Sequence, residues 1–170
     1  MTIIFDKSKK ISLDDESFRS ELLAIASKIK DVIPLGRGDP DFHTPKHIVE
    51  AAKRALDDNK HHYTPPNGLP ELRIAISKNL QEKYNLTYDE NEIVVTAGVQ
   101  ESIALAMLSL LETGDEVLIT SPRFTTYDLN VRMCNAKPIP IPTYEKNNFS
   151  LMPNIIEEKI NDKTKLIVLV

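Results

Sequence analysis

Hydrophobic residues in the first half of the chain recur at the three- and four-residue spacing of amphipathic helices. This spacing predicts a helix at residues 15–29, and two more helices are expected at residues 45–58 and 69–84. The second helix has Thr44 in the N-cap position and Pro45 at its first helical position, a combination typical of helix starts. Between the helices lie two irregular, turn-rich stretches, L-G-R-G-D-P-D-F and Y-T-P-P-N-G-L-P-E-L-R.

From Glu92 onward the pattern becomes a strict alternation of short β-branched runs and helical segments. The predicted strands are residues 93–96, 116–120, 136–141 and 166–170, and the predicted helices are residues 100–111, 124–133 and 153–160. Strands and helices in turn, with short joints, indicate βαβ units and a parallel sheet. The predicted fold class is therefore α/β, and no internal linker or repeat divides the chain.

The third predicted strand carries a proline at every second position. Pro138, Pro140 and Pro142 each lack a backbone N–H, so alternate ladder hydrogen bonds cannot form. This pattern predicts either a strand at the edge of the sheet or a ragged ladder.

Composition narrows the class of protein further. Of the 170 residues, 41% are hydrophobic and 27% charged, as in folded globular proteins rather than disordered ones. The net charge of −4 and the pI near 5.6 argue against nucleic-acid or anionic-membrane partners. No apolar run is long enough to span a membrane, the start does not resemble a signal peptide, and the single Cys134 cannot form an internal disulfide. A cytoplasmic location is expected.

The first stretch that could carry chemistry is V-T-A-G-V-Q-E-S, where a predicted strand passes through Gly98 into a helix. The start of a helix presents unpaired N–H groups and the positive end of its dipole, which suits a phosphate. Thr96 or Gln100 could add side-chain donors. Small residues at such a joint can also serve packing alone. The stretch matches neither a G-x-G-x-x-G fingerprint nor a P-loop, so dinucleotide and ATP sites are poorly supported.

Three further stretches offer candidate residues. Phe124, in S-P-R-F-T-T-Y, follows a predicted strand and could stack on a flat ligand or belong to the core. Gly38, in G-R-G-D-P-D-F, could offer backbone donors to a carboxylate or simply form a turn. Tyr63 could donate to an anion through its phenol, or pack in its loop. It follows His61 and His62, which have no third ligand nearby for zinc.

The order of these motifs is more specific than any one of them. G-D-P-D-F-H-T-P, Y-T-P-P-N-G-L-P-E-L-R, V-T-A-G-V-Q-E-S and G-D-E-V-L-I-T-S-P-R-F-T-T-Y follow one another along the chain. In this order the sequence resembles the first part of a class I/II aminotransferase. These are fold-type I enzymes that use pyridoxal phosphate (PLP), and the resemblance covers residues 35–170.

The resemblance implies a role for each candidate residue. Gly98, Val99 and Gln100 would form the turn that cradles the cofactor phosphate, and Phe124 would stack on the pyridine ring. Gly38 would bind the substrate α-carboxylate through its backbone. Tyr63 would reach the phosphate of the neighbouring subunit's cofactor, so the resemblance implies a homodimer acting on an amino acid and a 2-oxo acid.

The resemblance also implies that some residues of the family's active site are expected beyond Val170. In the family, the strand matching L-I-V-L-V runs into N-P-x-N-P-T-G, and the lysine that holds PLP as a Schiff base comes much later. That lysine is expected beyond Val170, so residues 1–170 contain no expected catalytic residue and should be inactive alone. Residues 1–34 would be an arm and helix of the small domain, and residues 35–170 the first part of the PLP-binding large domain.

Two alternatives stay open at this point. A PLP-dependent carbon–sulfur β-lyase of the same fold shares these N-terminal motifs. A non-catalytic, truncated paralogue acting by dimerisation would also retain them, although a sheet edge left exposed carries an aggregation risk.

Overall fold

The computed structural model describes residues 21–33, 38 and 40–170. Of these, residues 21–28 and 97–170 belong to one compact unit, and residues 29–33, 38 and 40–96 belong to a second. Residues 21–26 are helical, as predicted for this part of the 15–29 helix, but residues 27–29 are not helical; residues 15–20 lie outside the described residues.

The second unit consists of helices α2 (Lys46–Asp57) and α3 (Pro70–Tyr84) and the short 3-10 helix η1 (Glu90–Glu92). The predicted Thr44 cap is wrong. Pro45 is the N-cap residue, and no side chain caps the helix, because the proline side chain carries no hydrogen-bond acceptor; the Pro45 carbonyl accepts from the amides of Ile48 and Val49.

Arg73 of α3 is the one buried residue among the described residues of this unit. Its guanidinium donates to the backbone carbonyl of Glu90 at 2.7 Å, which connects α3 to η1. None of the hydrophobic side chains described in this unit is buried.

The predicted strand at residues 93–96 is absent. Ile93 has extended backbone angles, but a strand needs a neighbouring strand to bond to. Instead the amide of Val95 donates to the Asn67 carbonyl at 3.1 Å. Gly68, at φ +98°, packs so closely that an added Cβ would lie 2.7 Å from the Cβ of Val95. The Y-T-P-P-N-G stretch therefore occupies one of the amides that a sheet partner would otherwise use.

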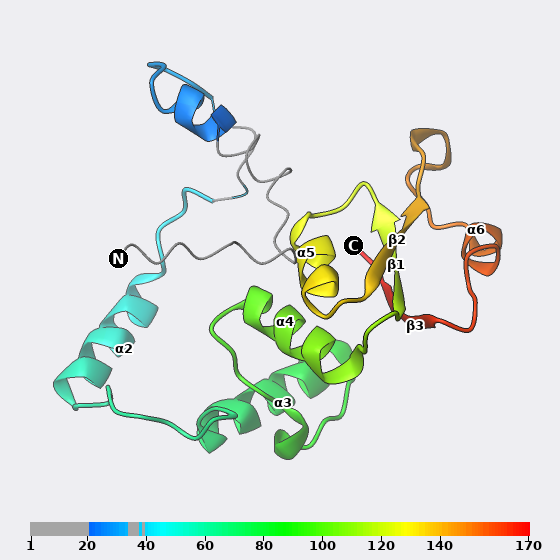
Figure 1. Ribbon diagram of the computed structural model, residues 1–170. Helices are drawn as coiled ribbons and strands as arrows, with labels where there is room; N and C mark the ends of the chain where they lie inside the picture. Colours follow the sequence, from blue (N-terminus) through cyan, green and yellow to red (C-terminus); the bar gives the residue numbers. More distant parts are fainter. Residues whose placement is uncertain (1–20, 34–37, 39) are drawn as a thin grey trace, which may run out of the picture. The chain divides into compact units, whose positions relative to one another are not determined.

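The first unit contains a parallel sheet and the helices that cover it (Figure 1). In chain order its elements are α4 (Val99–Leu110), β1 (Glu116–Ser121), α5 (Thr126–Met133), β2 (Lys137–Pro142), η2 (Glu145–Asn147), α6 (Pro153–Glu157) and β3 (Thr164–Val168). The three strands are parallel in the order β2-β1-β3. The α/β class and the parallel sheet predicted from the sequence are confirmed.

The hydrophobic core surrounds the central strand β1. Val117, Leu118 and Ile119 are fully buried, as expected for a strand covered on both faces. Val117 and Ile119 pack in one cluster with Met107 of α4 and Val131 of α5. Burial of each such side chain contributes roughly 1.5–3 kcal/mol, so this cluster anchors the two helices on the sheet.

The proline-bearing strand β2 lies at an edge, as predicted. The amides of Lys137 and Thr143, at its two ends, donate to β1-side carbonyls at 2.8 Å each. Because strand residues alternate in direction, Pro138, Pro140 and Pro142 fall at the positions that face away from β1. The missing donors are therefore on the outer edge.

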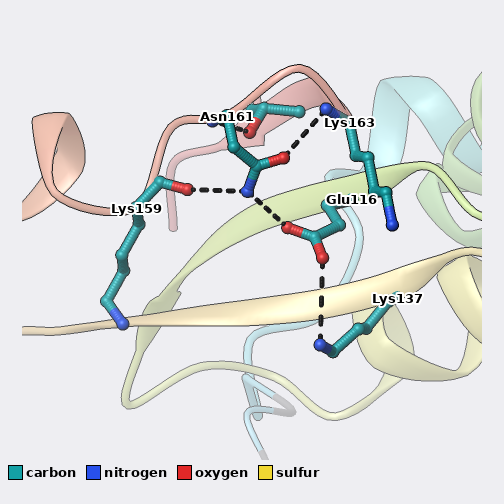
Figure 2. Close-up of polar contacts among 6 residues, drawn as sticks. Glu116, Lys137, Lys159, Asn161 and Lys163 are labelled. Carbon is teal, nitrogen blue, oxygen red and sulfur yellow. Dashed lines mark hydrogen bonds and ion pairs between the residues drawn. The ribbon is translucent and has the colours of Figure 1, made fainter.

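A polar cluster joins the starts of the three strands (Figure 2). The Glu116 carboxylate accepts from the side-chain amide of Asn161 at 2.9 Å and lies 3.8 Å from the Lys137 ammonium. The same Asn161 amide donates to the Lys159 carbonyl, and its side-chain oxygen accepts from the amide of Lys163. The cluster lies where the β1–β3 register shifts by one residue, between Glu116 and Val117.

Candidate functional site

The turn at Gly98 opens helix α4 and has a geometry that only glycine adopts without strain. Gly98 is the N-cap residue, with φ 96° and ψ 165°. An added Cβ would meet no atom within 4 Å, so the space above the turn is open. The amides of Val99 and Gln100 are the first two of the helix and have no acceptor within it. A 12-residue helix thus begins with oriented donors beside open space, an arrangement that suits an anionic group.

Further hydrogen bonds hold this turn on both sides of Gly98. The Gly98 carbonyl accepts from the amides of Glu101 at 3.1 Å and Ser102 at 3.4 Å. The Glu101 carboxylate reaches back to accept from the amide of Ala97 at 2.5 Å. The backbone conformation of the turn is therefore fixed by its own first helical turn.

Phe124 follows the carboxyl end of β1, as predicted. The strand ends at Ser121, and α5 begins at Thr126. The Phe124 side chain is 45% exposed, so much of its ring is accessible at the end of the sheet where ligands of parallel α/β proteins bind.

An ion pair that sequence reasoning missed holds the segment on which Phe124 lies. Arg123 donates to both carboxylate oxygens of Asp128, at 2.6 and 2.5 Å, and both side chains are partly buried. This two-pronged hydrogen bond raises the pKa of Arg123 above its ordinary value, against the opposing effect of burial. The sequence did contain a signal for this ion pair: Asp128 lies in the first turn of α5, five residues after Arg123.

The remaining predicted site residues, Tyr63 and Gly38, belong to the 29–96 unit. The Tyr63 side chain is fully exposed, and an added Cβ at Gly38 would meet no atom within 4 Å. Their roles stay predictions. The neighbouring His61 and His62 rings lie 4.7 Å apart, and no group of three metal-ligating side chains occurs among the described residues.

No helix in the described ranges is long and apolar enough to cross a membrane. The cytoplasmic location stays a prediction.

The parallel sheet and the helices that cover it define an α/β protein, with a glycine turn at the start of α4 and an accessible ring after β1. The family model for aminotransferase class I and II matches residues 30–170. The chain belongs to this family, and the resemblance read from its motifs is confirmed.

Individual relatives agree with this assignment. The chain is 46% identical to an aspartate aminotransferase of Pyrococcus horikoshii, over 95% of this chain and 41% of the relative. It is 48% identical to a probable aspartate aminotransferase of Methanocaldococcus jannaschii, over 81% of this chain and 36% of the relative. The crystal structure of the Rhizobium meliloti aspartate aminotransferase is similar with a TM-score of 0.87 and 33% identity, covering 96% of this chain and 42% of that one. The chain thus spans about two fifths of the length of these relatives.

Proposed function

We propose that this chain supplies the cofactor-binding N-terminal part of a PLP-dependent aminotransferase, which moves an amino group between an L-amino acid and a 2-oxo acid. The observation that carries the proposal is the Gly98 turn at the start of α4, in a chain that belongs to the aminotransferase family. Residues 35–170 would form the first part of the large domain, and residues 1–34 would belong to the small domain.

The residues present fit two parts of PLP. The open space above Gly98 and the amides of Val99 and Gln100 suit its phosphate, and the half-exposed Phe124 ring suits the face of its pyridine ring. When bound, PLP supplies the electron sink for breaking bonds at the substrate Cα. The work of these residues is to bind the cofactor and fix its orientation.

Two roles in substrate binding and assembly complete the proposal. The Gly38 backbone would bind the substrate α-carboxylate. Tyr63, whose phenol is fully exposed, would reach the cofactor phosphate of a second subunit in a homodimer. The names of the relatives in Pyrococcus horikoshii and Methanocaldococcus jannaschii support L-aspartate as the first amino donor to test.

The test uses the complete gene product that contains this sequence. The purified apoprotein is titrated with PLP and followed by absorbance, then given L-aspartate and 2-oxoglutarate. We expect saturable PLP binding and the formation of oxaloacetate and glutamate in equal amounts, because the amino group passes from one to the other.

Two results would overturn this function. An apoprotein that does not bind PLP would exclude it. Release of a thiol, ammonia and a 2-oxo acid from a sulfur-containing amino acid, with no acceptor present and no transamination, would identify a carbon–sulfur lyase instead.

A further inference from the structure

Glu101 makes an unusual contact at the turn where the phosphate is proposed to bind. It is the third residue of α4, and its carboxylate accepts from the amide of Ala97 at 2.5 Å. Ala97 precedes the N-cap residue Gly98, so this hydrogen bond spans the glycine.

This contact differs from an ordinary capping box. In a capping box the glutamate at the third helical position accepts from the amide of the N-cap residue itself. The same chain contains such a box in η1, where Glu92 accepts from the amide of its N-cap residue Asp89 at 2.8 Å. Glu101 reaches one residue further back and closes a loop around Gly98.

The hydrogen bonds at this turn also show which backbone amides already have an acceptor and which could still donate to a phosphate. The amide of Ala97 is occupied by Glu101, and the amides of Glu101 and Ser102 are occupied by the Gly98 carbonyl. The amides of Val99 and Gln100 remain as the first donors of the helix. The loop closed by Glu101 therefore directly precedes these two donors.

The charge of Glu101 opposes phosphate binding. A carboxylate beside a phosphate site repels the bound anion and offsets part of the favourable helix dipole. Any favourable effect of Glu101 on phosphate binding must therefore come from its hydrogen bond.

We propose that Glu101 is a positioning residue for the cofactor phosphate: its hydrogen bond to Ala97 holds the Gly98 turn so that the Val99 and Gln100 amides converge on the phosphate. This inference rests on the proposed function. It adds to that function a residue that does not itself touch the cofactor.

Two substitutions separate the hydrogen bond from the charge. Glu101→Gln keeps an acceptor oxygen at the same reach, and Glu101→Ala removes it, while both lack the negative charge. We expect PLP to bind Glu101→Gln at least as tightly as the unchanged protein, and Glu101→Ala about tenfold more weakly than Glu101→Gln, the size expected for one lost hydrogen bond.

The measurement is the dissociation constant of PLP for the apo form of the complete gene product, compared with that of pyridoxal, which has no phosphate. A role in phosphate positioning changes the PLP constant and leaves the pyridoxal constant within about twofold, whereas a general loss of structure weakens both. Glu92→Gln and Glu92→Ala form the matched control pair, because the first keeps and the second removes the acceptor of a side-chain-to-amide hydrogen bond at η1.

The outcomes are distinguishable. Equal PLP affinities for Glu101→Gln and Glu101→Ala, or parallel losses for PLP and pyridoxal, would overturn the inference. If Glu101→Ala does not fold, Glu101→Asp replaces it. Aspartate keeps the charge but is one methylene shorter, so it should bind PLP more weakly than either the unchanged protein or Glu101→Gln. Failure of the unchanged protein to bind PLP would instead reject the proposed function itself.

Discussion

Gly98 and Gly114 have nearly the same backbone conformation, with φ of +96° and +95°, and an added Cβ would meet no atom within 4 Å at either position. They differ in surroundings. Gly98 opens α4 at the proposed phosphate site, whereas Gly114 lies in the turn before β1 and donates to the Asn135 carbonyl. At the scale of single residues, substituting each of these two glycines therefore distinguishes the effect of backbone strain, which both share, from an effect on cofactor binding, which only Gly98 should show.

Alanine at either glycine should cost stability through strain alone. We expect Gly98→Ala and Gly114→Ala each to lower the free energy of unfolding by about 1–3 kcal/mol, since a side chain is disfavoured at these angles. Only Gly98→Ala should also weaken PLP binding, by about tenfold or more, because the first amides of α4 would turn away from the phosphate. Chemical denaturation and PLP titration measure the two effects, and equal PLP affinities for both variants would contradict the assignment of the phosphate turn.

At the scale of elements, the Arg123–Asp128 pair connects the end of β1 to α5. Because the pKa of Arg123 is raised, its charged form is favoured by folding. The resulting stabilisation is fully present below the ordinary arginine pKa and is lost only as the pH rises through the raised value. The pair should therefore hold across neutral and moderately alkaline pH.

Removing one member of this pair should destabilise the protein. We expect Arg123→Ala to lower the free energy of unfolding by about 1–3 kcal/mol, since the partly buried Asp128 carboxylate is left without its partner. A double-mutant cycle with Asp128→Ala measures the coupling, expected at about 1–2 kcal/mol. A coupling near zero would mean that the bidentate contact contributes nothing to stability.

A separate prediction concerns the edge strand β2. Its prolines fall on the side that faces away from β1, where their missing N–H groups prevent another strand from pairing. Pro140→Thr adds a donor on that side, so we expect more self-association at high protein concentration, measured by light scattering. Ile139→Val is the control, because its amide faces β1. An unchanged scattering profile for Pro140→Thr would argue that this edge is protected in another way.

At the scale of the whole molecule, burial is concentrated around β1. All eight buried hydrophobic residues of the described chain lie between Met107 and Ile141, and the described part of residues 29–96 contributes none. Helix α2 exposes Ile48, Val49 and Leu56. Helical stability in proteins comes mainly from packing of such apolar faces, so α2 needs a covering surface to be stable.

This uneven burial predicts how residues 1–170 behave when produced alone. We expect strong binding of a hydrophobic dye such as ANS and slow amide exchange confined to β1 and its neighbours, with fast exchange at residues 46–57. Hydrogen-exchange mass spectrometry checks this. A single cooperative thermal transition with protection across α2 and α3 would contradict it.

The sequence by itself determined the kinds of element and their order in the sheet-containing unit. The β-branched runs and the helical spacing are local patterns, and three of the four predicted strands form with limits within two residues of those expected. The prolines at positions 138, 140 and 142 indicated an edge strand for the same local reason, because each removes its own donor. The motifs also identified the family, since their order is a property of the chain alone.

Only the tertiary structure decided which segments pair. The order β2-β1-β3 puts the last strand on the far side of β1 from β2, and the segment at residues 93–96 pairs with no strand, the amide of Val95 donating to the Asn67 carbonyl instead. The Arg123–Asp128 pair and the Glu101–Ala97 bond join residues only five and four positions apart, but the spacing alone does not show that each turn folds back so that these side chains reach their partners. The hydrophobic period of a sequence shows where a strand or helix can form, but its partner is chosen by backbone and side-chain contacts that no local pattern contains.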